Sequence, residues 1–178
     1  MLPEGKLPRA GRTIDLRMPW QKLTLAEAFA RHASMELHEA LATDCFEEIL
    51  TSEVEPHLGT EKPTFLTEYP SSQAALARTK PGEPEVAERF ELYIDGLELA
   101  NAFSELTDPE EQRHRFEEDE ALRRTAGKRP YPLPEKFLDE LSSMPEAAGI
   151  ALGLDRLVML LTGATEIDQV VAFSPDEL

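Results

Sequence analysis

Hydrophobic and polar residues alternate most regularly in the middle of the chain, and this pattern predicts three strands. Residues 64–69 are rich in β-branched and aromatic side chains, which favour a strand. Residues 90–95 alternate between apolar and polar positions, and the dipeptide Asp95-Gly96 is typical of a two-residue hairpin turn. Residues 97–106 then form the returning strand. The pattern therefore predicts two adjacent antiparallel strands joined at this turn.

Helical patterns lie on both sides of these strands. Thr24 with Glu27, and Asp44 with Glu47, match the capping box that begins a helix. The helices that begin at these boxes are predicted to end at about residues 33 and 54. Further helices are predicted from Pro109, over 135–142 and over 154–162, the last with Gly163 as C-cap. Strands are predicted over 148–153 and 170–173, and irregular structure over 1–22 and 71–87. Hairpins, rather than helical crossovers between parallel strands, predict an α+β fold with an antiparallel β-sheet flanked by helices.

Composition and charge narrow the classes of function. The 178 residues carry a net charge of -17, which excludes non-specific nucleic-acid binding because that binding needs clustered Lys and Arg. The single cysteine, Cys45, allows no internal disulfide and favours a reducing compartment. Neither a signal peptide nor an apolar run of the ~18–20 residues that span a membrane is present, so we expect a cytoplasmic protein without a membrane partner. Residues 1–60 are predicted to be a helical, peripheral segment, and residues 61–178 to hold the sheet.

Two acidic residues flank the predicted hairpin turn. Glu91 and Glu98 lie on neighbouring strands, close to opposite each other, where two carboxylates repel unless a positive charge lies between them. A magnesium ion with bound phosphates is one such charge, because magnesium prefers oxygen ligands. Two solvated surface acids are the alternative, and the spacing alone favours that alternative.

The returning strand carries a second group of polar residues. Strict alternation places Asn101, Phe103 and Glu105 on one face of the strand. An acid, an amide and an aromatic ring together can cradle an ammonium-bearing side chain through charge, hydrogen bonding and packing on methylenes. A half-buried strand with a few polar residues is an equally good interpretation of the same pattern.

A glycine-punctuated strand runs directly into an apolar helix near the end of the chain. Gly149 and Gly153 can let a ligand approach the backbone, and Arg156 enters at the first helical turn, where anions are favoured. Asp155 is expected to satisfy the helix N-terminus and to hold Arg156 in place. The alternative is a purely structural Asp–Arg pair, and the segment does not match a P-loop.

Taken together, these segments resemble the class II aminoacyl-tRNA synthetases. Residues 149–156 are similar to motif 3 of that family, and residues 89–91 and 98–106 resemble the active-site strands of its lysyl-tRNA synthetase subgroup. Residues 65–77 and Ala151 are most similar to the paralogues that attach lysine to a lysine of translation elongation factor P. The resemblance marks the second part of the chain as the C-terminal part of a synthetase-like catalytic core.

The resemblance implies an antiparallel sheet flanked by helices, usually in a homodimer, and a two-step reaction. Lysine and ATP form lysyl-adenylate and pyrophosphate, and the lysyl group then passes to an acceptor. We expect elongation factor P as acceptor, because the sequence contains no visible anticodon-binding domain. Two alternatives remain open: lysyl-tRNA synthetase proper, with tRNA as acceptor, and a non-catalytic module that binds ATP, lysine or a partner.

The resemblance also implies a role for each candidate residue. Glu91 and Glu98 would hold magnesium and the ATP phosphates, Leu99 and Gly153 would offer backbone contacts to the nucleotide, Arg156 would contact the terminal phosphate or stack on adenine, and Asn101 and Glu105 would bind lysine with Phe103 packing nearby. Catalysis of this kind is mainly positioning and charge neutralisation, so no protein nucleophile is required.

The chain departs from the family pattern in four respects. The family's motif 1, which builds the dimer, and motif 2, whose Arg grips the α-phosphate, are not found in this sequence. Ala102 replaces a residue that is usually Gly, and Ser104 replaces the His common in the elongation-factor subgroup. Because losing one oxyanion-type contact can lower a rate by ~10²–10³, this chain alone is expected to activate lysine poorly or not at all.

Overall fold

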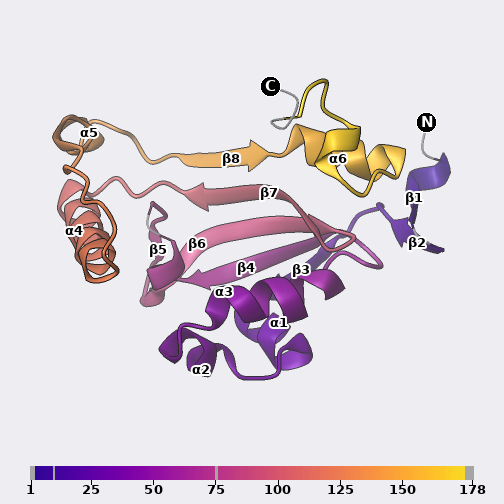
Figure 1. Ribbon diagram of the computed structural model, residues 1–178, viewed down its shortest axis with the longest axis horizontal. Coiled ribbons are helices and arrows are strands. Elements are labelled where there is room, and N and C mark those ends of the chain that lie inside the picture. Colours follow the sequence, from indigo (N-terminus) through magenta and orange to yellow (C-terminus); the bar gives the residue numbers. More distant parts are fainter. Residues whose placement is uncertain (1–2, 10, 75, 175–178) are drawn as a thin grey trace. The chain divides into compact units, whose positions relative to one another are not determined.

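The computed structural model describes residues 3–9, 11–74 and 76–174 (Figure 1). The strands are β1 (Lys6–Arg9), β2 (Arg12–Asp15), β3 (Gln21–Thr24), β4 (Thr64–Pro70), β5 (Thr79–Lys80), β6 (Glu83–Ile94), β7 (Leu97–Ser104) and β8 (Ala148–Leu152). The helices are α1 (Leu25–His32), α2 (Leu37–Ala42), α3 (Phe46–Ile49), α4 (Pro109–Thr125), α5 (Glu135–Leu141) and α6 (Leu154–Thr162), with short helical turns η1 (Pro3–Gly5), η2 (Leu50–Val54), η3 (Glu55–His57), η4 (Ser71–Gln73) and η5 (Ile167–Gln169).

The main sheet confirms the α+β prediction with one difference. Its strand order is β3-β4-β6-β7-β8, with β5 paired to β6, and β1 and β2 form a separate antiparallel pair. However, β3 and β4 are parallel, with Gln21 opposite Thr64, and α1, α2 and α3 connect them. The prediction of hairpins without a helical crossover was therefore wrong at this pair, because parallel neighbours need a crossover connection.

The predicted hairpin between β6 and β7 is confirmed, although β6 begins at Glu83, within the segment expected to be irregular. Asp95 and Gly96 both have positive φ angles, 59° and 74°, as the turn requires. The Asp95 carboxylate accepts hydrogen bonds from Arg9 and Arg12, which ties the turn to the first two strands. Burial raises the pKa of Asp95, but these two guanidinium groups outweigh burial and hold it below its ordinary value.

Of the two predicted capping boxes, one is confirmed and one is wrong. Thr24 and Glu27 form the predicted capping box at α1, with the Thr24 N–H 2.9 Å from the Glu27 carboxylate. The box predicted at Asp44 was wrong, because Asp44 adopts a left-handed φ of 57° and the N-cap of α3 is Cys45, without a side-chain cap. The helices predicted at 109, 135–142 and 154–162 are confirmed, and Gly163 ends α6 in the left-handed conformation.

Two segments differ from the prediction for reasons of local pairing. Residues 6–24 form β1, β2 and β3 rather than irregular structure, with Leu7 opposite Ile14 in a short antiparallel pair. Residues 170–173 form a turn and bend rather than a strand, because the N–H groups of Val170 and Val171 both bond to the Ile167 carbonyl.

The chain divides into two compact units. The first unit contains residues 1–68, 90–101 and 150–178, and the second contains residues 69–89 and 102–149. The N-terminal helices therefore share a unit with later parts of the chain. Of the described helices, none has both the length and the hydropathy that crossing a bilayer demands.

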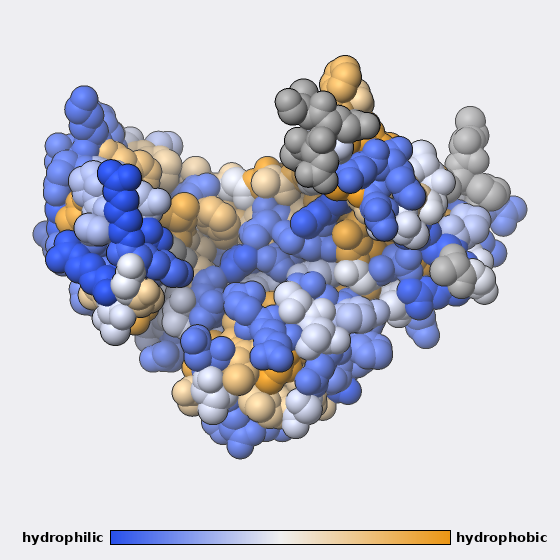
Figure 2. Space-filling view, in the orientation of Figure 1, coloured by the Kyte–Doolittle hydropathy of each residue, from blue (hydrophilic) through white to orange (hydrophobic). Residues whose placement is uncertain are grey.

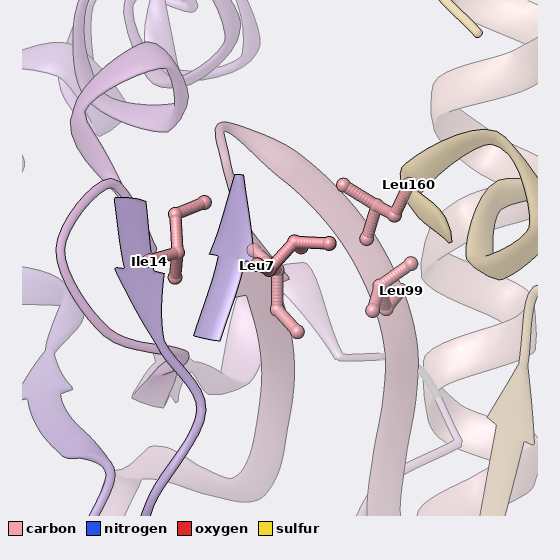
Figure 3. Packing of buried hydrophobic residues seen from close by; sticks show 5 residues of the cluster. Leu7, Ile14, Leu99 and Leu160 are labelled. Atoms are coloured by element: carbon pink, nitrogen blue, oxygen red, sulfur yellow. The ribbon is translucent and has the colours of Figure 1, made fainter. Parts of the chain in front are cut away.

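The core of the first unit joins segments that are far apart in the sequence. Leu7 and Ile14 of the first strand pair lie with Leu99 of β7 and Leu160 of α6 in one buried cluster (Figure 3). This cluster packs α6 against β7. In the second unit, Arg115 of α4 donates to the carbonyls of Ala74 and Ala77, at 3.1 and 2.8 Å, and so anchors that loop to the helix.

Candidate functional site

A buried carboxylate on β6 is the centre of the polar network in the first unit. Glu91 is only 6% exposed, and a buried charge is tolerated only where hydrogen-bond donors surround it. Its Oε1 accepts from Asn101 Nδ2 at 3.0 Å, and its Oε2 accepts from the Tyr93 hydroxyl at 2.7 Å. The structure therefore brings the predicted residues Glu91 and Asn101 into direct contact, and fixes which side of the Asn101 amide faces the carboxylate.

Glu55, at the start of η3, joins this network although the sequence analysis missed it. Its Oε1 lies 3.0 Å from the Tyr93 hydroxyl. Burial raises the pKa of Glu55, the bond from Tyr93 opposes that rise, and the charges of Glu91, Glu98 and Glu47 add to it. Nothing in the local sequence marks Glu55, because its partner Tyr93 is 38 residues away.

Glu98 and Arg156 form the second part of the site. Arg156 Nη1 donates to Glu98 Oε2 at 3.0 Å and to the Glu98 backbone carbonyl at 2.8 Å. The guanidinium thus places a positive charge on Glu98, one of the two neighbouring acids. Asp155 was expected to hold Arg156, and this was wrong: consecutive helix residues do not face each other, and Glu98 of β7 takes that place.

Gly153 makes room for the arginine and joins α6 to the sheet. Its N–H donates to the Leu99 carbonyl at 2.8 Å, and its own carbonyl accepts from Leu157. A Cβ at Gly153 would lie 3.3 Å from Arg156 Cδ, so glycine leaves the space that the arginine stem uses. The two predicted nucleotide contacts, Leu99 and Gly153, are therefore bonded to each other, and their contact with a nucleotide stays a prediction.

The first turn of α6 has the features of an anion site. Gly153 caps the helix without a side-chain bond, and the side chain of Arg156 is 44% exposed. The N-terminus of a helix offers N–H groups and a positive dipole end to an anion, and a phosphate also pairs well with a guanidinium.

Two predicted lysine-binding residues lie in the second unit. Phe103 packs against a cluster of buried alanines, and the Glu105 N–H donates to the Ala147 carbonyl at 2.9 Å. A Cβ at Gly149 would lie 2.8 Å from Glu105 Oε1, so the approach that Gly149 permits is that of this carboxylate. Because Asn101 belongs to the first unit, a lysine pocket that unites it with Phe103 and Glu105 stays a prediction.

The carboxylates of the site fit a magnesium ion only if phosphate oxygens supply further ligands. Among the residues that the structure describes, no group of three or more His, Cys, Asp or Glu is arranged to hold a metal. Glu91 and Glu98 both lie near enough to Glu55 to raise its pKa, so their charges act on the same region. Carboxylate oxygens are the ligands that magnesium prefers, and it commonly binds one or two of them together with substrate phosphates.

Comparison with known proteins agrees with this arrangement. The family of class II tRNA synthetases (D, K and N) matches residues 5–177. An elongation factor P--(R)-beta-lysine ligase of Salmonella dublin is 41% identical over 181 residues, which cover 89% of this chain and 56% of that protein. The ligase of the same name from Salmonella gallinarum is 50% identical over 129 residues, covering 72% of this chain and 40% of that protein.

The family match includes both parts of the site. The chain spans about half the length of the curated relatives it matches, at 56% and 40% of the two named above. The family match nevertheless extends over nearly the whole chain, from the first strand pair to beyond η5. This chain belongs to the class II tRNA synthetase family, and within it is similar to the elongation factor P lysine ligases, which are paralogues of lysyl-tRNA synthetase.

Proposed function

We propose that this chain is the lysine- and nucleotide-binding part of a ligase that activates lysine with ATP and transfers the lysyl group to a lysine of elongation factor P. One observation carries the proposal: Arg156, at the open N-terminus of α6, is held on Glu98 within the unit in which Glu91 orients Asn101. The names of the relatives support the reaction and favour elongation factor P over tRNA as acceptor.

The proposed chemistry needs charge neutralisation and alignment rather than a nucleophile on the protein. Arg156 and the first turn of α6 bind ATP phosphates. Glu91 and Glu98 would hold magnesium, which supplies positive charge to the phosphates when bound. Asn101 of the first unit is proposed to contact the lysine, and Phe103 and Glu105 of the second unit are proposed as lysine-binding residues in their own right. We extend the proposal to a homodimer in the cytoplasm, as is usual for the family that the sequence resembles.

The exposed surface of the first unit supports the idea that a further part of the core completes the site. Ile150 and Leu152 of β8 are 65% and 55% exposed, on a strand that forms the edge of the sheet. Leu154 and Leu161 of α6 are also exposed, and Figure 2 shows apolar surface in the region of α6. Apolar surface of this kind marks a contact site. We propose that the part of the catalytic core that carries motifs 1 and 2 covers it.

The test is to separate binding from turnover. Calorimetric titration of the chain with ATP–Mg²⁺ and with lysine is expected to give binding, because the residues that hold these ligands are present. ATP–pyrophosphate exchange with (S)-α-lysine or (R)-β-lysine is expected to be at background, because the sequence pattern indicates no motif 2 in this chain.

The Salmonella dublin ligase, assayed in parallel, is the positive control for exchange. Binding of neither ligand would contradict the proposal, and exchange by the chain alone would contradict its dependence on a further part of the core. Aminoacylation of tRNA, but not of elongation factor P, by the chain joined to such a part would favour lysyl-tRNA synthetase proper.

A further inference from the structure

The segment between β4 and β5 pairs with the chain at the end of β7. We call this segment, residues 71–74 and 76–78, the β4–β5 loop. Ala77 of the loop pairs with Glu105 in an isolated antiparallel bridge, and the Leu106 N–H donates to the Leu76 carbonyl at 3.0 Å. The backbone at Glu105, one of the two candidate lysine-binding residues of the second unit, is therefore held by this loop.

Phe103, the other candidate lysine-binding residue of the second unit, packs against the same loop. Two of the three buried alanines that it contacts, Ala74 and Ala77, belong to the loop, and the third, Ala87, belongs to β6. Phe103 is only half-buried, so part of it stays accessible. The position of the β4–β5 loop therefore determines the surroundings of both candidate residues.

Arg115 of α4 fixes this loop from the side of the helix. Its Nη1 donates to the carbonyls of Ala74 and Ala77, at 3.1 and 2.8 Å. Its Nε donates to Glu111 Oε1 one helical turn away at 2.9 Å, which holds the guanidinium in place. Only 11% of the Arg115 side chain is exposed, so water competes little for these charge-assisted bonds. One guanidinium nitrogen thus bonds both carbonyls of the loop and fixes the turn between them.

We propose that Arg115 is a positioning residue of the lysine site. It fixes the β4–β5 loop through two carbonyls, and the loop in turn fixes Phe103 and Glu105. Arg115 acts through the loop rather than by contact with lysine, because its Nε and Nη1 donors already bond within the protein. The effect on lysine rests on the proposed function, whereas the effect on the loop does not.

Amide hydrogen exchange tests the effect on the loop without a ligand. Arg115→Met keeps an apolar stem and removes the donors. In this variant the Leu106 amide is expected to exchange at least about tenfold faster, because its acceptor lies in the released loop. The Asp95 amide, which bonds to Gly59 in the first unit, is expected to keep its rate. An unchanged rate at Leu106 would overturn the proposal.

Calorimetric titration tests the effect on lysine. Arg115→Met is expected to raise the dissociation constant for lysine about tenfold, because a displaced loop misplaces the groups that bind it. The dissociation constant for ATP–Mg²⁺ is expected to stay within about twofold, since Arg156 belongs to the first unit. A purely structural role would instead lower the number of folded, binding-competent molecules, without changing the affinity of each. An equal rise for both ligands would contradict the proposal.

Two further variants of arginines on α4 sharpen this test. Arg115→Lys keeps a charged group with three donors, so its dissociation constant for lysine is expected to lie between those of the unaltered chain and Arg115→Met. Equal losses in the two variants would show that donation to the carbonyls is not needed, and would overturn the role. The matched control is Arg113→Met, at an arginine of the same helix that pairs with Glu135, and no change in lysine affinity is expected.

The results also distinguish the positioning role from the function on which it rests. Loss of lysine affinity in Glu105→Gln with none in Arg115→Met would support the proposed function and overturn the role of Arg115. Absence of lysine binding by the unaltered chain would refute the proposed function and the positioning role together. The exchange rate at Leu106 would still decide whether Arg115 fixes the loop.

Discussion

Replacement of Gly59 by alanine is expected to lower the free energy of unfolding of the first unit by about 3–5 kcal/mol. Gly59 has a φ of +70°, where an L side chain is strained. A Cβ there would lie 2.4 Å from the Tyr93 carbonyl oxygen and 2.6 Å from Ile94 Cα. Both neighbours are backbone atoms, so no side-chain rotation can relieve the overlap and β6 or the loop must move.

The position of Gly59 explains why this movement reaches the site. The Asp95 N–H donates to the Gly59 carbonyl at 3.0 Å, and the Gly96 N–H donates to the Leu58 carbonyl at 2.8 Å. The loop after η3 is thereby fastened along the end of β6 that carries Tyr93. Displacing it separates Tyr93 from Glu55, so Gly59→Ala is expected to weaken lysine binding as well as stability.

Urea unfolding followed by the fluorescence of Trp20, the one tryptophan in the sequence, measures the loss in the correct unit. The indole packs on Phe65 and donates to the Leu16 carbonyl, so its signal reports on native packing. The matched control is Gly11→Ala: Gly11 has a φ of +83° with no atom within 4 Å of the added Cβ. Its expected loss is only the conformational strain, about 1–2 kcal/mol. Equal losses for the two variants would contradict the overlap argument.

The parts of the fold that the sequence predicted are those with a local cause. The Asp95-Gly96 turn, the Thr24 capping box and the end of α6 at Gly163 each depend on residues within four positions of one another. The first two strands are different. They are four residues each and contain Pro8, and they are ordered because Leu7 and Ile14 are buried against β7 and α6. That reason lies far along the chain and has no local signature.

The same contrast between local and distant causes applies to the residues of the site. Residue type and spacing were enough to single out Glu91, Glu98 and Arg156. Their partners were not predictable, because Arg156 meets Glu98 across 58 residues and Tyr93 meets Glu55 across 38. Sequence proximity even misled, since the adjacent Asp155 was assigned the role that Glu98 performs. Tertiary packing determines which charged side chains pair, because the buried cluster of the first unit packs α6 against β7.

Arg156→Ala is expected to raise the dissociation constant for ATP–Mg²⁺ by about 10–10²-fold. A hydrogen bond between a guanidinium and a phosphate is worth about 1.5–3 kcal/mol, and alanine removes it. The substitution also leaves Glu98 without its cation in a region where Glu91 is already negative, which repels phosphate further. The dissociation constant of Arg156→Lys is expected to lie between those of the unaltered chain and the alanine variant, because a lysine keeps the charge but loses the bidentate geometry of the guanidinium.

Calorimetric titration with ATP–Mg²⁺ and with AMP decides how Arg156 contacts the nucleotide. If the guanidinium binds the terminal phosphate, the alanine variant loses affinity for ATP but keeps its affinity for AMP; if it stacks on adenine, both affinities fall by the same factor. The matched control is Arg17→Ala, which removes an exposed arginine that pairs with Asp15 at 2.8 Å in the same unit. Unchanged affinity for ATP in the Arg156 variant, or an equal loss in the Arg17 control, would remove Arg156 from the nucleotide site.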